Sequence, residues 1–450
     1  MVAPRHALWL LTLFSFGLIP GQTSGDGSLA IVNVTVIDST GAPARGETTV
    51  VVENGRIVSI GPSSKMLVPK GIRTVSGAGK YLIPGLWDAH VHALWDAGRA
   101  EQFLPLFLAN GVTNVREMGG PMPAEEQVTW RRRVALGEVV GPDLLVSGPF
   151  VDGPRPVYAG SLAIADEAAA RKAVDGLQAF GVDFIKVYSQ VPREAWFALA
   201  DEARIKRIPF AGHVPLQIDA GEASDAGQLS IEHLMGVLLA ASSRGEDLKN
   251  RLLSGANINE LNDELVDTFD PSRAEALFRR FARNGTWQVP TLTIRHARPF
   301  LAELAASDDT RLKYMPKAIV AGWVLRDDPR QPGTAAAVES RKRVYRKELE
   351  VVGAMNRAGV PIAAGTDTPN PFCFPGFSLH DELALLVEAG LSPMQALQAG
   401  TRNAAMMTGR GSELGTIEKA RWRIWCCWTR IHWPIFVTPA GLTASFCTAG

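Results

Sequence analysis

The sequence is poor in cysteine, and this limits how the chain can be stabilised. It holds four cysteines in 450 residues, three of them after residue 425, so that Cys373 is the only cysteine in the rest of the chain. Secreted domains that depend on disulfides carry several cysteines spread along the sequence. The cysteine pattern therefore excludes a disulfide framework.

The sequence also lacks an excess of charge of either sign. Lys and Arg together number 46, and so do Asp and Glu, which gives a formal net charge of zero. We find no block of like charge and no basic stripe along the chain. Proteins that bind nucleic acid need such a basic patch to neutralise phosphates. We therefore expect no nucleic-acid partner.

The apolar run near the N-terminus, residues 7–19, is too short to span a membrane. A transmembrane helix needs about 20 apolar residues. Arg5 precedes the run and Pro20-Gly21 ends it, a pattern typical of a secretory signal peptide. We predict a signal peptide at residues 1–25, a secreted or periplasmic location, and no stable membrane insertion after cleavage. An uncleaved membrane anchor is the alternative.

The remaining chain divides into two regions. Residues 28–81 read as short strands rich in Val and Ile, which predicts the N-terminal part of a small β-domain. From residue 82 onward, eight strand-like runs alternate with helical patterns. This alternation is typical of βαβ units with a parallel sheet. We predict an α/β fold with a distorted (β/α)8 TIM-type barrel over residues 82–411, and a helical insertion at residues 299–357.

Histidines end several of the strand-like runs. The chain has eight histidines, and four of them close such runs: His90 and His92 in GLWDAHVH, His213 in FAGHV and His233 in SIEHL. Asp367 closes the last run, AAGTD, in the same way. Barrel enzymes keep their chemistry at the carboxyl ends of the strands. We therefore expect these five side chains to meet at one face of the barrel.

The chemistry of this set points to a divalent metal ion. Side chains two positions apart on a strand share a face, so His90 and His92 point the same way. Neutral imidazoles and a carboxylate are common ligands of divalent metals. An isolated pair of this kind is more often a pair of surface or core histidines, but the repetition at equivalent strand ends favours a metal site. Asp367 is also placed to accept a proton.

Lys186, in FIKVY, is the unusual member of the group. It lies in an apolar strand and would point toward the same mouth of the barrel. A buried ammonium beside metal ions is disfavoured by desolvation and by like charge. From the residues alone, a lysine that extends to solvent or pairs with Asp183 or Glu232 is an equal alternative.

Six motifs in a fixed order make the chain resemble the amidohydrolase superfamily: GLWDAHVH, GVTNVREMGG, DFIKVYS, PFAGHV, SIEHL and AAGTDTP. The resemblance covers about residues 30–420. Within the superfamily, the chain is most similar to the imidazolonepropionase-like branch, which includes Xaa-Pro dipeptidase-like enzymes. Imidazolonepropionases proper lack the lysine, so Lys186 argues against that activity here.

The resemblance implies a binuclear centre with two divalent metal ions, for which we expect zinc. It also implies that CO₂ carboxylates Lys186 to an anionic carbamate that bridges the metals. This modification would remove the electrostatic objection to a lysine at this position. By the resemblance, one metal takes His90, His92, Lys186 and Asp367, and the other takes Lys186, His213 and His233.

The activity that the resemblance implies is hydrolysis of an amide bond, in a peptide or in a ring. A metal-bridging hydroxide attacks the carbonyl, and Asp367 serves as general base and then as general acid. The partner is a small-molecule or dipeptide-like substrate, and a homo-oligomer is left open. The alternatives are a dipeptidase or Xaa-Pro-type peptidase, a lactonase, and a metal-binding barrel that a damaged C-terminus has made inactive.

Substrate-binding residues are expected in the loops after the strands. The candidates are Arg116 after the second strand, Tyr188 after the fourth and Thr291 after the seventh. Tyr188 would hydrogen-bond a substrate carboxylate or the developing oxyanion, or else pack at the barrel rim. We expect His380 to cap or pack at a helix start, and His296 to be structural or exposed.

The C-terminal segment, residues 412–450, departs from the family pattern. After GTIEK the chain continues as ARWRIWCCWTR, whereas the resemblance implies a return to the small β-domain to complete a β-sandwich. Reading the codons of WCCWT one base earlier forces Val-Leu-Leu-Asp, which is the missing family segment. We therefore hypothesise a frameshift near residue 420 that disrupts the C-terminal part of the small domain.

Overall fold

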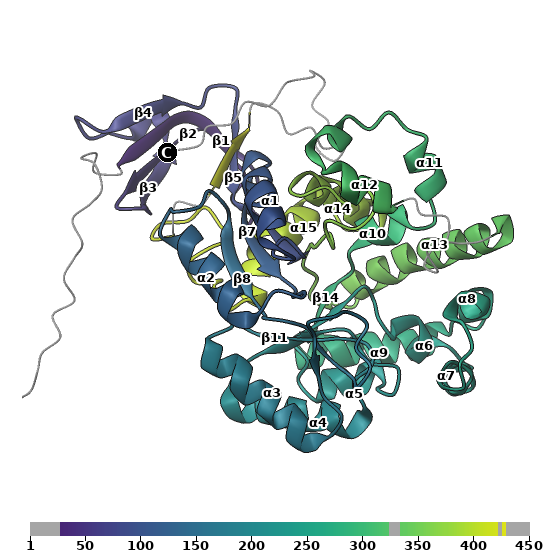
Figure 1. The fold of residues 1–450 in the computed structure, drawn as a ribbon. Helices are drawn as coiled ribbons and strands as arrows, with labels where there is room; N and C mark the ends of the chain where they lie inside the picture. The colour runs from purple at the N-terminus through teal and green to yellow at the C-terminus, as the bar shows by residue number, and fades with distance from the viewer. Residues whose placement is uncertain (1–27, 324–333, 422–424, 429–450) are drawn as a thin grey trace, which may run out of the picture.

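The structure is a computed structural model that describes residues 28–323, 334–421 and 425–428 (Figure 1). A small β-sheet domain lies at one end of the molecule, and a larger α/β region makes up the rest. Among the described residues, none of the helices combines the length and the apolar character that crossing a bilayer requires.

The small domain is one sheet of six strands in the order β15-β5-β1-β2-β3, with β4 also paired to β1. β4 and β5 both run parallel to β1 and pair with different halves of it. A core that includes Val34, Val50 and Leu82 lies against this sheet. The predicted two-layer sandwich stays a prediction. The strands are β1 (Leu29–Val36), β2 (Arg45–Glu53), β3 (Arg56–Pro62), β4 (Arg73–Ser76), β5 (Tyr81–Pro84) and β15 (Trp425–Trp428), and a 3-10 turn, η1 (Ser63–Lys65), follows β3.

The C-terminal segment contributes a strand to this sheet. We hypothesised that a frameshift disrupts this part of the small domain, and β15 nevertheless pairs antiparallel with β5, with Cys426 opposite Ile83 and Cys427 opposite Leu82. Strand pairing uses backbone N–H and C=O groups, so residues 425–428 can pair with the edge strand β5 whatever their side chains are. The frameshift itself stays a hypothesis, and residues 429–450 lie outside the described residues.

A first prediction concerns this segment. We expect the chain with the restored frame to give a higher soluble yield and a higher melting temperature than the chain as it stands. The restored frame supplies aliphatic strand-forming residues beside β5 and removes a tail rich in Trp, which favours aggregation when it is exposed. The two forms are expressed and melted side by side, and equal yields with equal melting temperatures would count against the frameshift.

The larger region is built on parallel strands that close into a ring. Asp183 donates its backbone N–H to the carbonyl of Val146, which links the sheet of β6, β7 and β8 to the sheet that contains β11. The assigned strands of the ring are β6 (Leu86–Val91), β7 (Val112–Glu117), β8 (Asp143–Val146), β11 (Ile185–Val187), β12 (Phe210–Gly212), β13 (Ser230–Glu232) and β14 (Trp287–Val289). Two short strands, β9 (Val151–Asp152) and β10 (Leu162–Ala163), lie in the loop after β8.

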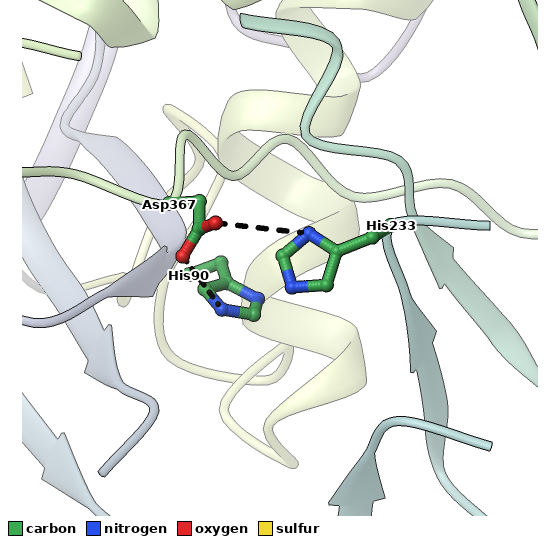
Figure 2. A group of neighbouring side chains, drawn as sticks. All are labelled: His90, His233 and Asp367. Carbon is green, nitrogen blue, oxygen red and sulfur yellow. Dashed lines mark ion pairs between the residues drawn. The ribbon is translucent and has the colours of Figure 1, made fainter. Parts of the chain in front are cut away.

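The eighth run closes the ring without being a regular strand. Residues 362–368 form single parallel bridges, Ile362 with Gln288 of β14 and Thr368 with Val91 of β6. Backbone hydrogen bonds such as that from Ala89 to the carbonyl of Ala364 join this segment to β6, and the backbone N–H of Thr366 donates to the side chain of Asp88 at 3.0 Å. The carboxyl ends of the strands thus meet at one face, where His90, His233 and Asp367 point toward one another (Figure 2).

Helices cover the outside of the ring because each buries one apolar face against it. In α3, for example, Ala170, Val174 and Leu177 are buried at helical spacing, and Asp166 caps the N-terminus by accepting from Ala169. These helices are α1 (Ala97–Ala109), α2 (Ala124–Ala135), α3 (Glu167–Phe180), α4 (Arg193–Lys206), α5 (Ala220–Asp225), α9 (Pro271–Asn284), α14 (Phe377–Glu388), α15 (Pro393–Gln398) and α16 (Ala404–Met407), with one π-helical turn, η3 (Ala399–Asn403), before α16.

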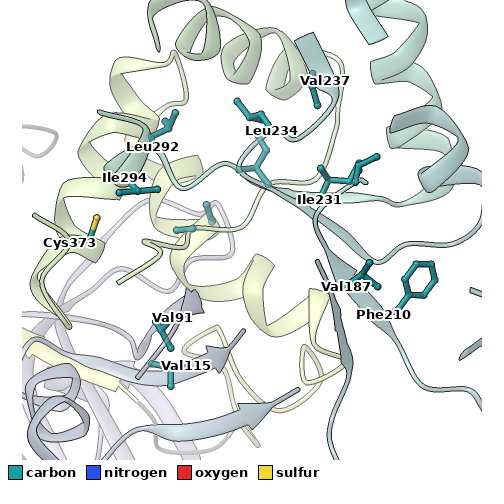
Figure 3. Packing of buried hydrophobic residues seen from close by; sticks show 14 of the residues in the cluster. Val91, Val115, Val187, Phe210, Ile231, Leu234, Val237, Leu292, Ile294 and Cys373 are labelled. Atoms are coloured by element: carbon teal, nitrogen blue, oxygen red, sulfur yellow. The ribbon is translucent and has the colours of Figure 1, made fainter. Parts of the chain in front are cut away.

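The main core lies between the strands and these helices (Figure 3). Val115, Val187 and Ile231, from three different strands, are fully buried in one cluster. Leu292 and Ile294 join the same cluster from the segment after β14. Because the residues that alternate with these strand positions face the inside of the ring, the packing fixes which side chains reach the mouth.

Two helical excursions leave the barrel, of which one was predicted. The helical character expected at residues 299–357 is found in its described residues, but Val351, Val352 and Met355 of the last helix are buried in the main core, so that helix covers the ring. A second excursion, of short helices, follows β13 and was not expected. Arg343 joins the two by ion pairs to Asp263 at 2.6 Å and Asp267 at 2.7 Å. The elements are α10 (Leu292–Ala297), α11 (Leu301–Ala305), η2 (Thr310–Tyr314), α12 (Lys317–Trp323) and α13 (Ala335–Arg357), and α6 (Val237–Ala241), α7 (Gly245–Leu253) and α8 (Ile258–Asp267).

Candidate metal centre

Four imidazoles meet at the carboxyl ends of the strands, as the sequence predicts. The ring centres of His90 and His92 are 5.3 Å apart, those of His90 and His233 4.5 Å, and those of His213 and His233 5.1 Å. His90 lies in β6, and His92 follows that strand by one residue. His213 and His233 directly follow β12 and β13. The four rings therefore form one continuous group.

Asp367 lies against three of these rings, and Figure 2 shows it with two of them, His90 and His233. Its Oδ1 is 3.4 Å from His90 Nε2 and 3.1 Å from His92 Nε2, and its Oδ2 is 4.0 Å from His233 Nδ1. The backbone N–H of Asp367 donates to the carbonyl of His90 at 2.8 Å, and its φ of +62° turns the carboxylate into the mouth. His90, His233 and Asp367 together have the spacing of a metal-binding group.

Lys186 points into the same region and is fully buried. Its Nζ has no hydrogen-bond partner, and its charge acts on His92, His213 and His233. Burial lowers the pKa of Lys186 to about 8, although the nearby carboxylates of Glu232 and Asp367 oppose this shift. The alternative of a solvent-exposed lysine is therefore wrong.

The other alternative, an ion pair of Lys186 with Asp183 or Glu232, is wrong as well. Asp183 accepts from Arg131 at 2.6 Å. Glu232 is hydrogen-bonded to Arg116 and His90, and it affects the pKa of Lys186 only through its charge. The ammonium is thus left in the mouth of the barrel without a direct partner.

Each imidazole has its Nδ1 held by a different group. His90 Nδ1 lies 2.7 Å from Glu232 Oε2, and His92 Nδ1 lies 2.7 Å from the carbonyl of Gly119. A carboxylate and a carbonyl only accept hydrogen bonds, so these two rings carry their proton on Nδ1 and keep the Nε2 lone pair free. Hydroxyl groups contact the other two rings. Ser189 Oγ lies 2.6 Å from His213 Nδ1, and Thr291 Oγ1 lies 2.7 Å from His233 Nδ1.

These contacts test whether a metal ion fits the group. His90 Nε2 and Lys186 Nζ are both buried without a hydrogen-bond partner. A buried polar atom left unpaired costs about 1–3 kcal/mol, so two in one place call for a ligand. Two oriented imidazoles with free Nε2 atoms and an adjacent carboxylate are the donor set of a divalent metal. The residues therefore fit a metal ion.

Arg116 is not where the sequence analysis placed it. We predicted a substrate-binding residue in a loop, but Arg116 lies within β7 and is 1% exposed. Its Nε donates to the carbonyl of Ala89 at 2.7 Å, its Nη1 to Ser230 at 3.0 Å and its Nη2 to Glu232 at 2.8 Å. The strand continues to Glu117, so residue 116 faces the inside of the barrel beneath the metal centre.

Glu232 connects Arg116 to the metal centre, a role that we did not predict. Its Oε1 accepts from Arg116 and Ser230, and its Oε2 holds His90. Burial opposes ionisation of Glu232, but the charges of Arg116 and His90 outweigh it and hold the pKa of this carboxyl at about 2. Glu232 is therefore a fixed negative charge below the cluster. The position of Glu232 directly before His233 in the sequence is the signal that could have indicated this role.

Asp367 is also kept ionised. Burial raises the pKa of this carboxyl, but His233, His90 and His92 lower it more, so that it lies well below its usual value. Glu117, in contrast, is buried near His92, and burial raises its pKa to about 7. The pKa values of the two carboxyls are thus shifted in opposite directions although the groups lie near the same rings.

The two other predicted substrate residues have different positions. Tyr188 lines the pocket above the cluster, and its ring lies 4.3 Å from that of His213. Thr291 is fully buried and contacts His233, so it orients a ring instead of lining the pocket. His380 lies near the start of α14 and contacts the carbonyl of Asn110, and His296 is half-buried against Phe300, as expected.

The pocket has a volume of about 640 Å³ and opens above the metal centre. Aromatic rings in mutual contact form one wall, with Phe150 4.7 Å from Tyr188 and Tyr158 5.2 Å from Trp95. Tyr188 was predicted, but Trp95, Phe150 and Tyr158 were not, because loop residues carry no regular pattern in the sequence. Basic side chains also line the pocket, namely those of Arg99, Arg295 and Arg298.

The ring of parallel strands and the cluster at its carboxyl ends define an α/β-barrel enzyme with a candidate metal site. The chain belongs to the Amidohydrolase family, whose profile matches residues 81–420. It is an amidohydrolase that acts on carbon–nitrogen bonds, as the sequence resemblance predicts.

Relatives with known names are similar over most of the chain. The imidazolonepropionase of Pseudomonas putida is 22% identical over 409 residues, which cover 85% of this chain and 87% of that protein. A Bifidobacterium longum structure assigned as a prolidase matches with a TM-score of 0.65 and 25% identity, covering 90% of this chain and 89% of that one. The structure of bottromycin amidohydrolase matches with a TM-score of 0.67 and 24% identity, covering 90% and 82%.

A second prediction concerns the hydroxyl groups that orient two of the rings. We expect Ser189→Ala and Thr291→Val each to weaken zinc binding by about 10- to 100-fold, because the supported ring loses its fixed orientation. Competition with a fluorescent chelator measures the affinity. Ser307→Ala, which removes a hydroxyl outside the pocket, is the matched control. Wild-type zinc affinity in both site variants would contradict this role.

Proposed function

We propose that the chain is a binuclear metal-dependent hydrolase that cleaves the amide bond of a small, dipeptide-like or cyclic substrate. The observation that carries this proposal is the buried convergence of four imidazoles, Asp367 and Lys186 at the carboxyl ends of the strands. A purely structural cluster would not leave His90 Nε2 and Lys186 Nζ buried without hydrogen-bond partners beside an ionised carboxylate.

The chain offers two overlapping ligand sets for metal ions. Divalent ions bound here would lower the pKa of a water molecule and polarise the carbonyl of the substrate. The first ion would be held by His90, His92, Lys186 and Asp367, and the second by Lys186, His213 and His233.

Lys186 can join both sets only after it loses its positive charge. Its neutral amine would add to CO₂ with release of one proton, which gives a carbamate with two oxygen ligands. The modification converts a buried cation into a buried anion among prospective cations, and this reverses an unfavourable interaction. Lys186 Nζ makes no hydrogen bond that would have to break before it reacts with CO₂.

Asp367 is the residue that we propose to move the proton. As an ionised carboxylate at the mouth, it can take a proton from the attacking water and deliver it to the leaving amine. Water thereby adds across the C–N bond to give an acid and an amine, and Asp367 returns to its initial state.

The pocket favours a substrate with an apolar ring and a carboxylate. Phe150 and Tyr188 offer an aromatic wall beside His213, on which a flat or cyclic group can pack. The charge of Arg298 acts on Tyr188, so a guanidinium and a phenol lie near the same part of the pocket. Together they would bind a carboxylate. The names of the relatives, imidazolonepropionase and prolidase, support a small amide of this kind.

The test combines metal analysis with a substrate panel. We expect about two zinc ions per purified chain and hydrolysis of at least one dipeptide or N-acyl amino acid with an apolar ring. The panel also includes lactams and lactones, so that a lactonase would be detected. Two bound zinc ions without any turnover would support an inactive metal-binding barrel instead, and no bound zinc would contradict the proposal. Export through the signal at residues 1–25 is part of the same proposal.

A further inference from the structure

One loop brings both an aromatic ring and an open apolar side chain to the pocket above the metal centre. It consists of residues 153–161, between β9 and β10, and we call it the wall loop. Its residues Val157 and Tyr158 line the pocket, and Val157 is 48% exposed although it is apolar. Ligand pockets are lined mainly by apolar and aromatic side chains of this kind. The wall loop therefore offers a surface on which a substrate can pack.

Tyr158 joins the aromatic rings of the pocket to one another. Its ring centre lies 5.2 Å from that of Trp95, 5.6 Å from that of Phe150 and 5.7 Å from that of Tyr188. These three residues follow three different strands, β6, β8 and β11. The contacts with Trp95 and Tyr188 are edge-to-face, which is an arrangement that aromatic pairs prefer. The wall is thus continuous only while Tyr158 keeps its position.

A buried carboxylate, that of Asp152, holds the wall loop. Its Oδ1 accepts from the backbone N–H groups of Gly153 at 2.9 Å and Gln190 at 2.7 Å, and its Oδ2 accepts from that of Val157 at 2.9 Å. Asp152 itself is fully buried. Because Gln190 lies two residues after Tyr188, one side chain fixes the wall loop to the segment that carries a second ring of the wall.

Two further contacts fix the wall loop in the same place. A Cβ atom added at Gly153 would lie 1.9 Å from the carbonyl oxygen of Gln190, so the two backbones touch at a point that only glycine permits. At the other end, Ser161 Oγ donates to the carbonyl of Tyr158 at 2.8 Å. The ring of Tyr158 is therefore in place before a ligand arrives, which lowers the entropy that binding must overcome.

We propose that Tyr158 is a specificity-determining residue that selects substrates with an apolar ring, and that Asp152 is a positioning residue that acts through it. The proposal rests on the function proposed above, since it assigns the ring preference of that same pocket to one loop. A substrate ring that packs on the wall loses its contact with water and gains contact with the edge of Tyr158. Asp152 is buried, so it affects a ligand through the position of the wall loop.

The first test compares two carboxylates that differ in a ring, 3-phenylpropanoate and propanoate. Neither contains an amide, so calorimetric titration of the zinc-loaded full chain measures binding without turnover. We expect wild type to prefer 3-phenylpropanoate, and Tyr158→Ala to lower the affinity for it by about 10-fold while the affinity for propanoate stays the same. Tyr314→Ala, which removes a ring stacked on Phe377 outside the pocket, is the matched control and should bind both probes as wild type does.

The second test separates positioning from a merely structural role. Asparagine at position 152 keeps the size of aspartate but has one acceptor oxygen instead of two. We expect Asp152→Asn to weaken 3-phenylpropanoate binding as Tyr158→Ala does, and the double variant to show no further loss. Gly153→Ala forces the wall loop away from Gln190 without changing the carboxylate, so it should give the same result by an independent route. Melting temperatures show which variants are folded.

Three results would overturn the proposal. A wild-type chain that binds both probes equally would exclude a ring preference. An unchanged preference in Tyr158→Ala would remove Tyr158 from recognition. Additive losses in the double variant would show that Asp152 does not act through Tyr158. The proposed amide hydrolysis is tested separately by its substrate panel, so a chain that hydrolyses amides but keeps its ring preference in Tyr158→Ala would contradict this inference alone.

Discussion

Replacement of Asp367 by asparagine is expected to lower kcat for the best amide substrate by roughly 10³-fold or more. Asparagine has nearly the same size, but it cannot take up a proton at neutral pH. The wild-type carboxylate is ionised because three imidazoles outweigh the effect of its burial. The variant removes both the proposed proton acceptor and a proposed charged metal ligand.

The measurement is steady-state kinetics with metal content determined on the same samples. Asp247→Asn, which changes an exposed aspartate on α7, is the matched control and is expected to keep the wild-type kcat. The melting temperature of Asp367→Asn should stay close to that of wild type when both are zinc-free. A variant that keeps its kcat with full zinc content would exclude Asp367 from the chemistry.

The second large effect is expected at the buried pair of Arg116 and Glu232. Arg116→Met leaves the charge of Glu232 in the barrel without its main partner, which typically costs about 3–5 kcal/mol of unfolding free energy. Glu232→Gln leaves Arg116 unpaired and weakens the support of His90, so zinc affinity should fall by about 10- to 100-fold. Denaturant unfolding and chelator competition measure the two effects.

The double variant tests how much of the expected loss of stability comes from leaving one charge of this pair unpaired. Arg116→Met combined with Glu232→Gln removes both charges, so we expect it to be more stable than the sum of the single losses predicts. Zinc affinity should stay low, since His90 still lacks a carboxylate partner. Simple additivity in stability would show that the two side chains do not interact in the way that their 2.8 Å contact indicates.

The convergence of the candidate metal ligands was predictable because strand ends carry a regular signal. His90, His213 and His233 each close an apolar run, and parallel strands bring their carboxyl ends to one face. The alternation of strands and helices predicted the barrel for the same reason. Asp367 followed from its equivalent place, although its segment forms only isolated bridges to the neighbouring strands and adds hydrogen bonds to a side chain, that of Asp88.

The groups that support the metal centre could not be predicted in the same way. Arg116 was placed in a loop because the end of β7 is not marked in the sequence, and a shift of two residues moves a side chain from the rim into the barrel. Thr291 reaches His233 only because its backbone has a φ of +50°, which no pattern of apolar residues reveals. The aromatic wall combines Trp95, Phe150 and Tyr188, which are far apart in the sequence. Such contacts depend on loop geometry.

The most direct test of the metal centre is a crystal structure of the zinc-loaded chain with an anomalous difference map at the zinc edge. We predict two peaks at the mouth of the barrel, one beside His90 and His92 and the other beside His213 and His233. Density for a carboxylate on Lys186 Nζ should lie between the two peaks. A map with no zinc peak among these rings, or an unmodified Lys186 turned away from the peaks, would contradict the account.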